Sequence, residues 1–111
     1  MKGTIKSKQE IERLFKKGRR FSCFYCSILV LSSPSQFQDG RCAFIAGKKL
    51  GNAPFRNRCK RVLRNIVFEI GGSIKNRDII YIAKKSVAYE SHDKVKKQVK
   101  KMLQEVEKIN N

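Results

Sequence analysis

The side chains best suited to chemistry in this 111-residue chain are basic ones gathered in a single short segment. They are Lys48, Lys49, Arg56, Arg58, Lys60, Arg61 and Arg64. Lysine and arginine bind phosphate, and the planar arginine fork also stacks on nucleobases. Arg56, Lys60 and Arg64 recur every fourth residue, so on a helix they would share one flank, with Arg58 and Arg61 on a second. The spacing predicts a helix that binds a polyanion.

The charge of the whole chain supports this interpretation. Lysine and arginine number 26 and aspartate and glutamate 9, which gives a net charge of +17. Such an excess repels itself and weakens the folded state unless a polyanion neutralises it. No acidic residue lies between Gly40 and Phe68, although a solvated helix face normally mixes signs. Nucleic acid is the expected partner. A membrane surface is the weaker alternative, because an interfacial helix needs an apolar face that is free of the core.

The sequence carries no pattern typical of export or of membrane insertion. No apolar run approaches the roughly 20 residues that a spanning helix needs. The charged stretch over 1–17 lacks the apolar centre of a secretory signal peptide. We therefore expect a cytoplasmic protein with no membrane partner.

Residues of the kinds that catalyse reactions or bind metals are scattered. Cys23 and Cys26 form a CxxC, which suggests zinc, but an odd separation within a predicted strand over 20–32 would put the two sulfurs on opposite faces. There is no second CxxC, and the single histidine, His92, is remote in sequence. The nine carboxylates form no cluster suited to two-metal phosphoryl transfer. We expect four reduced cysteines, no zinc or other metal site, and no catalytic residue, which disfavours a nuclease built of protein alone.

Hydrophobic periodicity and turn signals divide the chain into the elements of a single domain, 1–111, with a basic N-terminal extension over 1–6. Helices are predicted over 7–17, 53–70 and 91–108, and strands over 20–32, 41–47 and 78–83. Ser7 and Glu10 form a capping box, and Asn52 is the N-cap of the second helix. The order α-β-β-α-β-α predicts an α+β sandwich, in which helices pack on a small central sheet.

The aromatic residues near the N-terminus leave two interpretations open. Phe15 in the first helix, and Phe21 and Tyr25 in the strand that follows, are either core residues or a platform on which unpaired bases stack. Their spacing alone does not choose between the two.

The basic segment over 47–64 reads Gly-Lys-Lys-Leu-Gly-Asn-Ala-Pro-Phe-Arg-Asn-Arg-Cys-Lys-Arg-Val-Leu-Arg. Its Arg-Asn-Arg after Gly-Asn-Ala, followed by Lys-Arg-x-x-Arg, resembles the signature of the bacterial ribonuclease P protein subunit. The similarity covers nearly the whole chain, with Phe-Lys-Lys-Gly at the end of the first helix and Asp-Ile-Ile-Tyr-Ile-Ala-Lys-Lys after the signature. It implies a sandwich whose parallel strand pair is joined by a left-handed crossover, against the usual right-handed rule.

The resemblance also implies a function. The partner would be the catalytic RNA of ribonuclease P, an endonuclease that hydrolyses one phosphodiester of precursor tRNA and releases the 5′ leader. The RNA and the magnesium ions that it binds would perform the chemistry. The protein, a monomer on its own, would bind the leader and steady the RNA.

Carried over by position, the resemblance assigns the basic residues to two surfaces. The catalytic RNA would contact Lys48, Lys49, Asn52, Arg58 and Arg61. The leader would lie in a cleft between the first helix and the sheet, with Ile11, Phe15, Phe21, Tyr25 and Leu29 as its walls and Arg56, Asn57, Lys60 and Arg64 along its edge.

Two other function classes stand as alternatives. A structural RNA-binding protein of the ribosomal type would share this composition, and only the Arg-Asn-Arg context separates it from the first interpretation. A DNA-binding regulator would insert the helix over 53–70 into a major groove, but strands rather than a partner helix are predicted directly before it.

Overall fold

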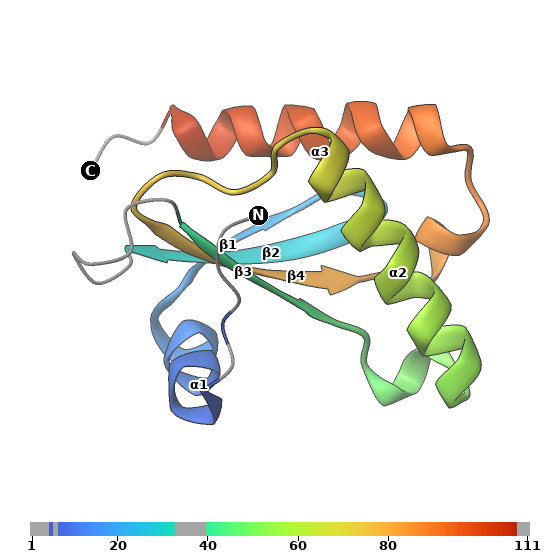
Figure 1. Cartoon of the computed structure of the whole chain (residues 1–111), viewed down its shortest axis with the longest axis horizontal. Coiled ribbons are helices and arrows are strands. Elements are labelled where there is room, and N and C mark those ends of the chain that lie inside the picture. The colour runs from blue at the N-terminus through green and yellow to red at the C-terminus, as the bar shows by residue number, and fades with distance from the viewer. Residues whose placement is uncertain (1–4, 6, 33–39, 109–111) are drawn as a thin grey trace.

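The structure, a computed structural model, describes residues 5, 7–32 and 40–108 and contains one mixed sheet in the strand order β1-β2-β4-β3. The helices are α1 (Lys8–Lys17), α2 (Ala53–Glu69) and α3 (His92–Glu107), and the strands are β1 (Arg19–Ser22), β2 (Cys26–Ser32), β3 (Arg41–Ile45) and β4 (Arg77–Ala83). Two short 3-10 turns, η1 (Lys48–Leu50) and η2 (Lys85–Ala88), follow β3 and β4. Helix α1 lies on one face of the sheet, and α2 and α3 cover the other (Figure 1). The predicted α+β sandwich is confirmed.

The strands β3 and β4 form a parallel pair, with Cys42 opposite Ile79, and α2 lies between them in the chain. The other pairs, β1 with β2 and β2 with β4, are antiparallel. This pairing agrees with the parallel pair that the resemblance implies. The hand of the crossover stays a prediction.

The single long strand predicted over 20–32 is wrong, because this segment is a hairpin of β1 and β2. Phe21 pairs with Ile28, and the backbone N–H of Cys23 donates to the carbonyl of Cys26 at 2.9 Å, which closes the turn. Phe24 and Tyr25 form that turn, where glycine, asparagine, aspartate or proline would normally signal one. Over the described residues, the observed order is therefore α-β-β-β-α-β-α, with four strands rather than the three predicted.

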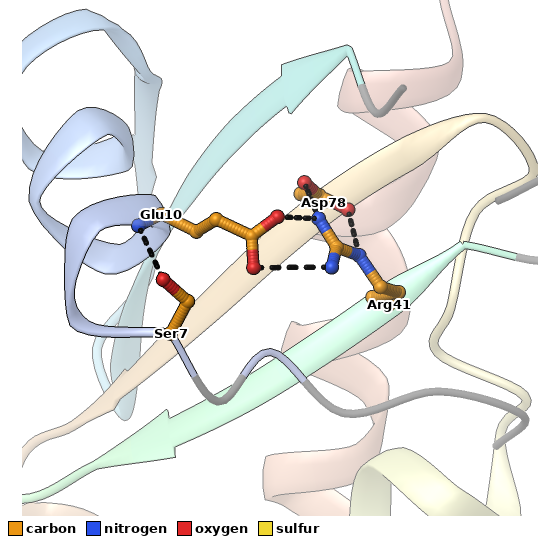
Figure 2. Close-up of polar contacts among 4 residues, drawn as sticks. All are labelled: Ser7, Glu10, Arg41 and Asp78. Carbon is orange, nitrogen blue, oxygen red and sulfur yellow. Dashed lines mark hydrogen bonds and ion pairs between the residues drawn. The ribbon is translucent and has the colours of Figure 1, made fainter. Parts of the chain in front are cut away.

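The predicted N-terminal caps of α1 and α2 are confirmed. Asn52 Oδ1 accepts the N–H of Phe55 at 3.0 Å, and Ser7 Oγ accepts the N–H of Glu10 at 3.4 Å. The second half of the capping box is wrong, because the Glu10 carboxylate does not reach back to the helix start. It binds Arg41 of β3 instead, with Nη2 donating to Glu10 Oε2 at 2.7 Å (Figure 2).

Two apolar cores lie on the two faces of the sheet. The larger one packs the sheet against α2 and α3, and the smaller one packs it against α1. The smaller core consists of Ile5, Leu14, Leu29, Ala43 and Ile80. Strand alternation puts Ile45 and Ile82 on this same face, where they pair with each other and stay only partly buried. Helix α1 is thus too short to cover the whole face.

Of the predicted N-terminal extension over 1–6, only Ile5 is among the described residues. It is buried, and its N–H donates to the carbonyl of Cys42 at 3.1 Å. None of the described helices is both long enough and apolar enough to cross a membrane.

Candidate nucleic-acid interface

Helix α2 presents its cations on two flanks. The side of the helix that faces the sheet is fixed by its buried stripe, which consists of Cys59, Leu63, Ile66 and Val67. Arg58 and Arg61 lie on the outer flank and are exposed. The opposite flank borders the sheet, and there Arg56 and Lys60 are half-buried.

Arg64 ends this inner flank against an aromatic ring of the edge strand. Its guanidinium carbon lies 5.6 Å from the centre of the Phe44 ring, within the range of a cation–π contact. The same ring stacks on Tyr81 of β4, with centroids 5.2 Å apart and planes 13° from parallel. This contact holds the guanidinium of Arg64 at the sheet edge, and Arg64 remains exposed to solvent there.

A groove of about 350 Å³ follows β3 along this edge of the sheet. It is lined by Ile5, Ile11, Cys42, Ala43, Phe44, Ile45 and Arg64. Ile11 comes from α1 and Arg64 from α2, so the groove joins both helices across the edge strand. An apolar floor with a cation above it suits unpaired nucleotides, whose bases stack and whose phosphates need neutralising.

Phe15 lies one turn after Ile11 on α1 and is 51% exposed. Residues four apart share a helix flank, so this ring extends the apolar surface that begins at Ile11. Ile11 and Phe15, two of the predicted cleft walls, thus lie on one flank of α1.

Two of the predicted cleft walls lie on the other face of the sheet, and a third is buried under the first helix. Phe21 and Tyr25 pack in the core on the α2 and α3 face, and Leu29 is buried beneath α1. Phe21 opposes Ile28 in the hairpin, so strand alternation turns both toward that larger core. Directly beneath α1 the predicted cleft is filled by the smaller core, and the open groove runs from Ile11 of α1 along the β3 edge of the sheet.

The remaining predicted residues surround the start of α2. Lys48 and Lys49 are exposed on η1, and Asn57 is exposed on the first turns of the helix. The Asn52 side-chain oxygen already accepts the Phe55 N–H as helix cap, so that atom has a structural role. The predicted set for the catalytic RNA is therefore gathered near one end of the helix.

Two cations on the α1 face were not predicted. Lys84 Nζ donates to Ser22 Oγ at 2.9 Å and to the Cys23 carbonyl at 2.7 Å, and Arg20 donates to Ser27 Oγ at 3.4 Å. They border the uncovered part of the sheet. The Lys-Lys pair directly after β4 could have indicated a cation here. The face of the sheet on which Lys84 lies depends, however, on its contacts with the β1–β2 hairpin, which was not predicted.

The predicted separation of the CxxC sulfurs is wrong as well. Cys23 Sγ and Cys26 Sγ lie 3.9 Å apart, because the chain turns between them instead of running straight. All four cysteines are free, three of them buried and Cys23 half-buried. Within the described ranges, no group of three or more histidine, cysteine, aspartate or glutamate side chains could hold a metal ion.

His92 belongs to a surface ion-pair cluster. Its Nε2 lies 3.0 Å from Glu69 Oε2, while Lys96 Nζ lies 2.9 Å from Glu69 Oε1. The hydrogen bond from Lys96, followed by that from His92, lowers the pKa of Glu69. The cluster joins the end of α2 to the start of α3 and lies outside the groove lining.

Comparison with known proteins agrees with this architecture. The family model described as Ribonuclease P matches residues 2–107. The ribonuclease P protein component of Syntrophomonas wolfei is 34% identical over 97 residues, covering 86% of this chain and 80% of that protein. The counterpart in Bacillus pumilus is 32% identical over 100 residues, covering 89% and 83%.

Solved structures share the fold. The RNase P protein of Staphylococcus aureus superposes with a TM-score of 0.78 at 24% identity, over 99% of this chain and all of that one. The RNase P protein of Thermotoga maritima superposes with a TM-score of 0.80 at 21% identity, also over 99% of this chain. With a family match over nearly its whole length and relatives above 30% identity, the chain belongs to the bacterial ribonuclease P protein family.

Proposed function

We propose that this chain, as the protein subunit of ribonuclease P, holds the 5′ leader of precursor tRNA in the β3 groove while the outer flank of α2 contacts the catalytic RNA. Membership of the family makes it a subunit of an RNA-containing endoribonuclease that acts in tRNA 5′ maturation. The family match does not favour the structural, ribosomal-type alternative.

The observation that carries the leader site is the position of Arg64 over Phe44 at the groove. The groove offers an apolar floor, and outside its lining Phe15 adds an exposed ring on the flank of α1 that carries Ile11. Arg56 and Lys60 add half-buried cations on the flank of α2 that carries Arg64. Stacking and phosphate contacts of this kind bind single strands with little sequence preference. Of the predicted walls, Ile11 and Phe15 keep this proposed role, and Phe21, Tyr25 and Leu29 act by supporting the sheet.

The proposed contact with the catalytic RNA rests on exposure and charge. Arg58 and Arg61 point away from the groove, and Lys48 and Lys49 flank the start of the same helix. Free cations on a rigid helix bind folded RNA through its phosphates, and each contact releases counterions. Two flanks of one helix would thus hold two RNAs in a fixed relation.

In this proposal the protein supplies binding, and the RNA with its magnesium ions supplies the hydrolysis. The cations of α2 lower the repulsion between substrate and catalytic RNA, which reduces the magnesium concentration needed for cleavage. We also propose that the protein acts in the cytoplasm and is a monomer before it meets the RNA.

A reconstitution experiment tests the two surfaces. The protein is combined with its cognate catalytic RNA, and affinity is measured for precursor tRNAs whose leaders lengthen stepwise and for mature tRNA. Arg64→Ala should reduce the gain in affinity that the leader gives and leave mature tRNA unchanged. Arg61→Ala should weaken assembly with the catalytic RNA and leave the leader gain intact once assembly is saturated.

The outcome that contradicts the proposal is equally clear. If both variants weaken assembly and leader binding alike, the assignment of two flanks is wrong. If the protein without RNA cleaves precursor tRNA at the leader junction, the subunit role itself is wrong.

A further inference from the structure

The turn between β1 and β2 brings two thiols together at one end of the sheet. Cys23 Sγ and Cys26 Sγ are 3.9 Å apart, and the backbone N–H of Cys23 donates to the Cys26 carbonyl at 2.9 Å. The ladder of Ser22 with Ser27 leads directly into this pair. The two cysteines therefore face each other across the last step of an antiparallel hairpin.

This backbone geometry permits a disulfide. A hydrogen-bonded antiparallel pair has its Cα atoms about 5.5 Å apart, and disulfides form at Cα separations of about 4.4–6.8 Å. The sulfurs must approach from 3.9 Å to about 2 Å, a change within reach of side-chain rotation and small shifts of the turn.

The two thiols differ in access. Cys26 is fully buried, whereas Cys23 lines a surface pocket of about 250 Å³ between the edge strand β1 and α3. The other residues of this pocket are Ser22, Gln98, Lys101, Met102 and Glu105. A small molecule in this pocket would therefore contact Cys23, whereas the buried Cys26 is accessible only to Cys23.

The surroundings of Cys23 favour its thiolate. A hydrogen bond from the Cys26 thiol, with smaller effects from the backbone N–H groups of Tyr25 and Cys26 and from the Lys84 charge, lowers the pKa of Cys23 to about 6. Burial raises the pKa of Cys42 to about 12 and also raises that of Cys59. Only one of the four thiols is thus both accessible and suited to nucleophilic attack.

We propose that Cys23 and Cys26 form a thiol–disulfide exchange site that reacts with low-molecular-weight disulfides. The Cys23 thiolate attacks one sulfur of the small disulfide, forms a mixed disulfide and releases one thiolate. Cys26 then loses its proton to solvent and attacks the Cys23 sulfur, and the second small thiolate leaves. The protein dithiol is oxidised by two electrons and the small disulfide is reduced to two thiols.

Oxidised glutathione is the probe, and the full-length reduced protein is the reactant. Peptide mass spectrometry should find a Cys23–Cys26 disulfide, with Cys42 and Cys59 still reduced as internal controls. The initial rate should fall only about twofold between pH 8 and pH 6, because a thiol with a pKa of about 6 is almost fully ionised at pH 8 and still about half ionised at pH 6. An ordinary thiol, with a pKa near 8.5, should slow by about 80-fold over that range.

Two variants separate the steps. Cys26→Ala should trap a mixed disulfide of Cys23 with one glutathione, and Cys23→Ser should abolish the reaction. Circular dichroism checks that both variants fold, and alkylation of the wild type at pH 6 gives the reactivity of Cys23 without any substitution. The proposal is overturned if the wild type forms no Cys23–Cys26 disulfide, if Cys42 or Cys59 reacts as fast, or if the rate follows the ordinary pH profile.

Discussion

Arg41 and Asp78 are joined by two hydrogen bonds inside the protein, Nε to Oδ1 at 3.0 Å and Nη2 to Oδ2 at 2.7 Å. The two residues oppose each other on the parallel strands β3 and β4, and both are buried. The same guanidinium donates to the Glu10 carboxylate of α1, as Figure 2 shows. One cation thereby fixes the first helix to the edge strand that forms the groove.

Removing this cation should destabilise the fold strongly. Arg41→Met leaves the buried Asp78 carboxylate without its partner, and the loss of one member of a buried pair costs about 3–5 kcal/mol. Urea unfolding measures the change. The control is Lys94→Met, which breaks an exposed pair with Glu90 at 3.7 Å and should cost less than about 0.5 kcal/mol. Equal losses in the two variants would show that burial does not govern this pair.

The exposed ring of Phe15 should matter for substrate and not for stability. Phe15→Ala removes one stacking partner, worth about 1–3 kcal/mol, so affinity for precursor tRNA should fall about tenfold. Phe68 is a matched control, since it is 65% exposed on α2 and does not share the α1 flank of Ile11 and Phe15. Filter binding with the reconstituted holoenzyme, together with thermal unfolding, separates the two effects. A comparable loss on Phe68→Ala would argue against a specific leader surface.

Binding to the catalytic RNA should depend steeply on salt. Each phosphate contact adds close to one to the slope of log affinity against log salt, so Arg58→Ala with Arg61→Ala should lower that slope by about two. Lys97→Ala on α3 is the control, because Lys97 is also exposed and lies on a helix that the proposal does not place on RNA. An unchanged slope in the double variant would remove the outer flank of α2 from the interface.

The surface cluster of Glu69 should make a small contribution to the free energy of unfolding that disappears at low pH. The pKa of Glu69 is lowered in the folded state, chiefly by Lys96, so its contribution is present above the unfolded pKa near 4.5 and is lost as pH falls through the folded pKa. Glu69→Gln should therefore lower the melting temperature at pH 7, and this difference should shrink progressively as pH falls below about 4.5. A difference that persists in acid would point to packing instead of charge.

Local signals in the sequence were sufficient for the helices and their caps. Asn52, for example, caps α2 through a contact only three residues away, and the apolar stripe of that helix repeats within the same segment. The hairpin was not predictable in this way, because its turn of Phe24 and Tyr25 contains none of the usual turn residues. That one error moved Phe21 and Tyr25 to the wrong face.

The groove depends on contacts between distant residues, and so only part of it was predictable. The motif identified Arg64, and helix periodicity put it on one flank with Arg56 and Lys60. Its partner Phe44 lies 20 positions earlier, on a strand whose place at the sheet edge follows from the whole topology. Arg41, which ties this strand to α1, carried no motif at all.

The short length of α1 has a mechanical consequence for whatever rests on the bare part of the sheet. Ile82 lies on that side of β4, while Ile79 and Tyr81 of the same strand are wedged into the large core behind it. A nucleotide stacked there would contact a strand that the large core holds in place from behind. Nearly all of the conformational entropy lost on binding would therefore be lost by the RNA and little by the protein. A substitution that loosens the packing of Ile79 should then lower the affinity for a flexible single strand, even though no atom of the contact surface has changed.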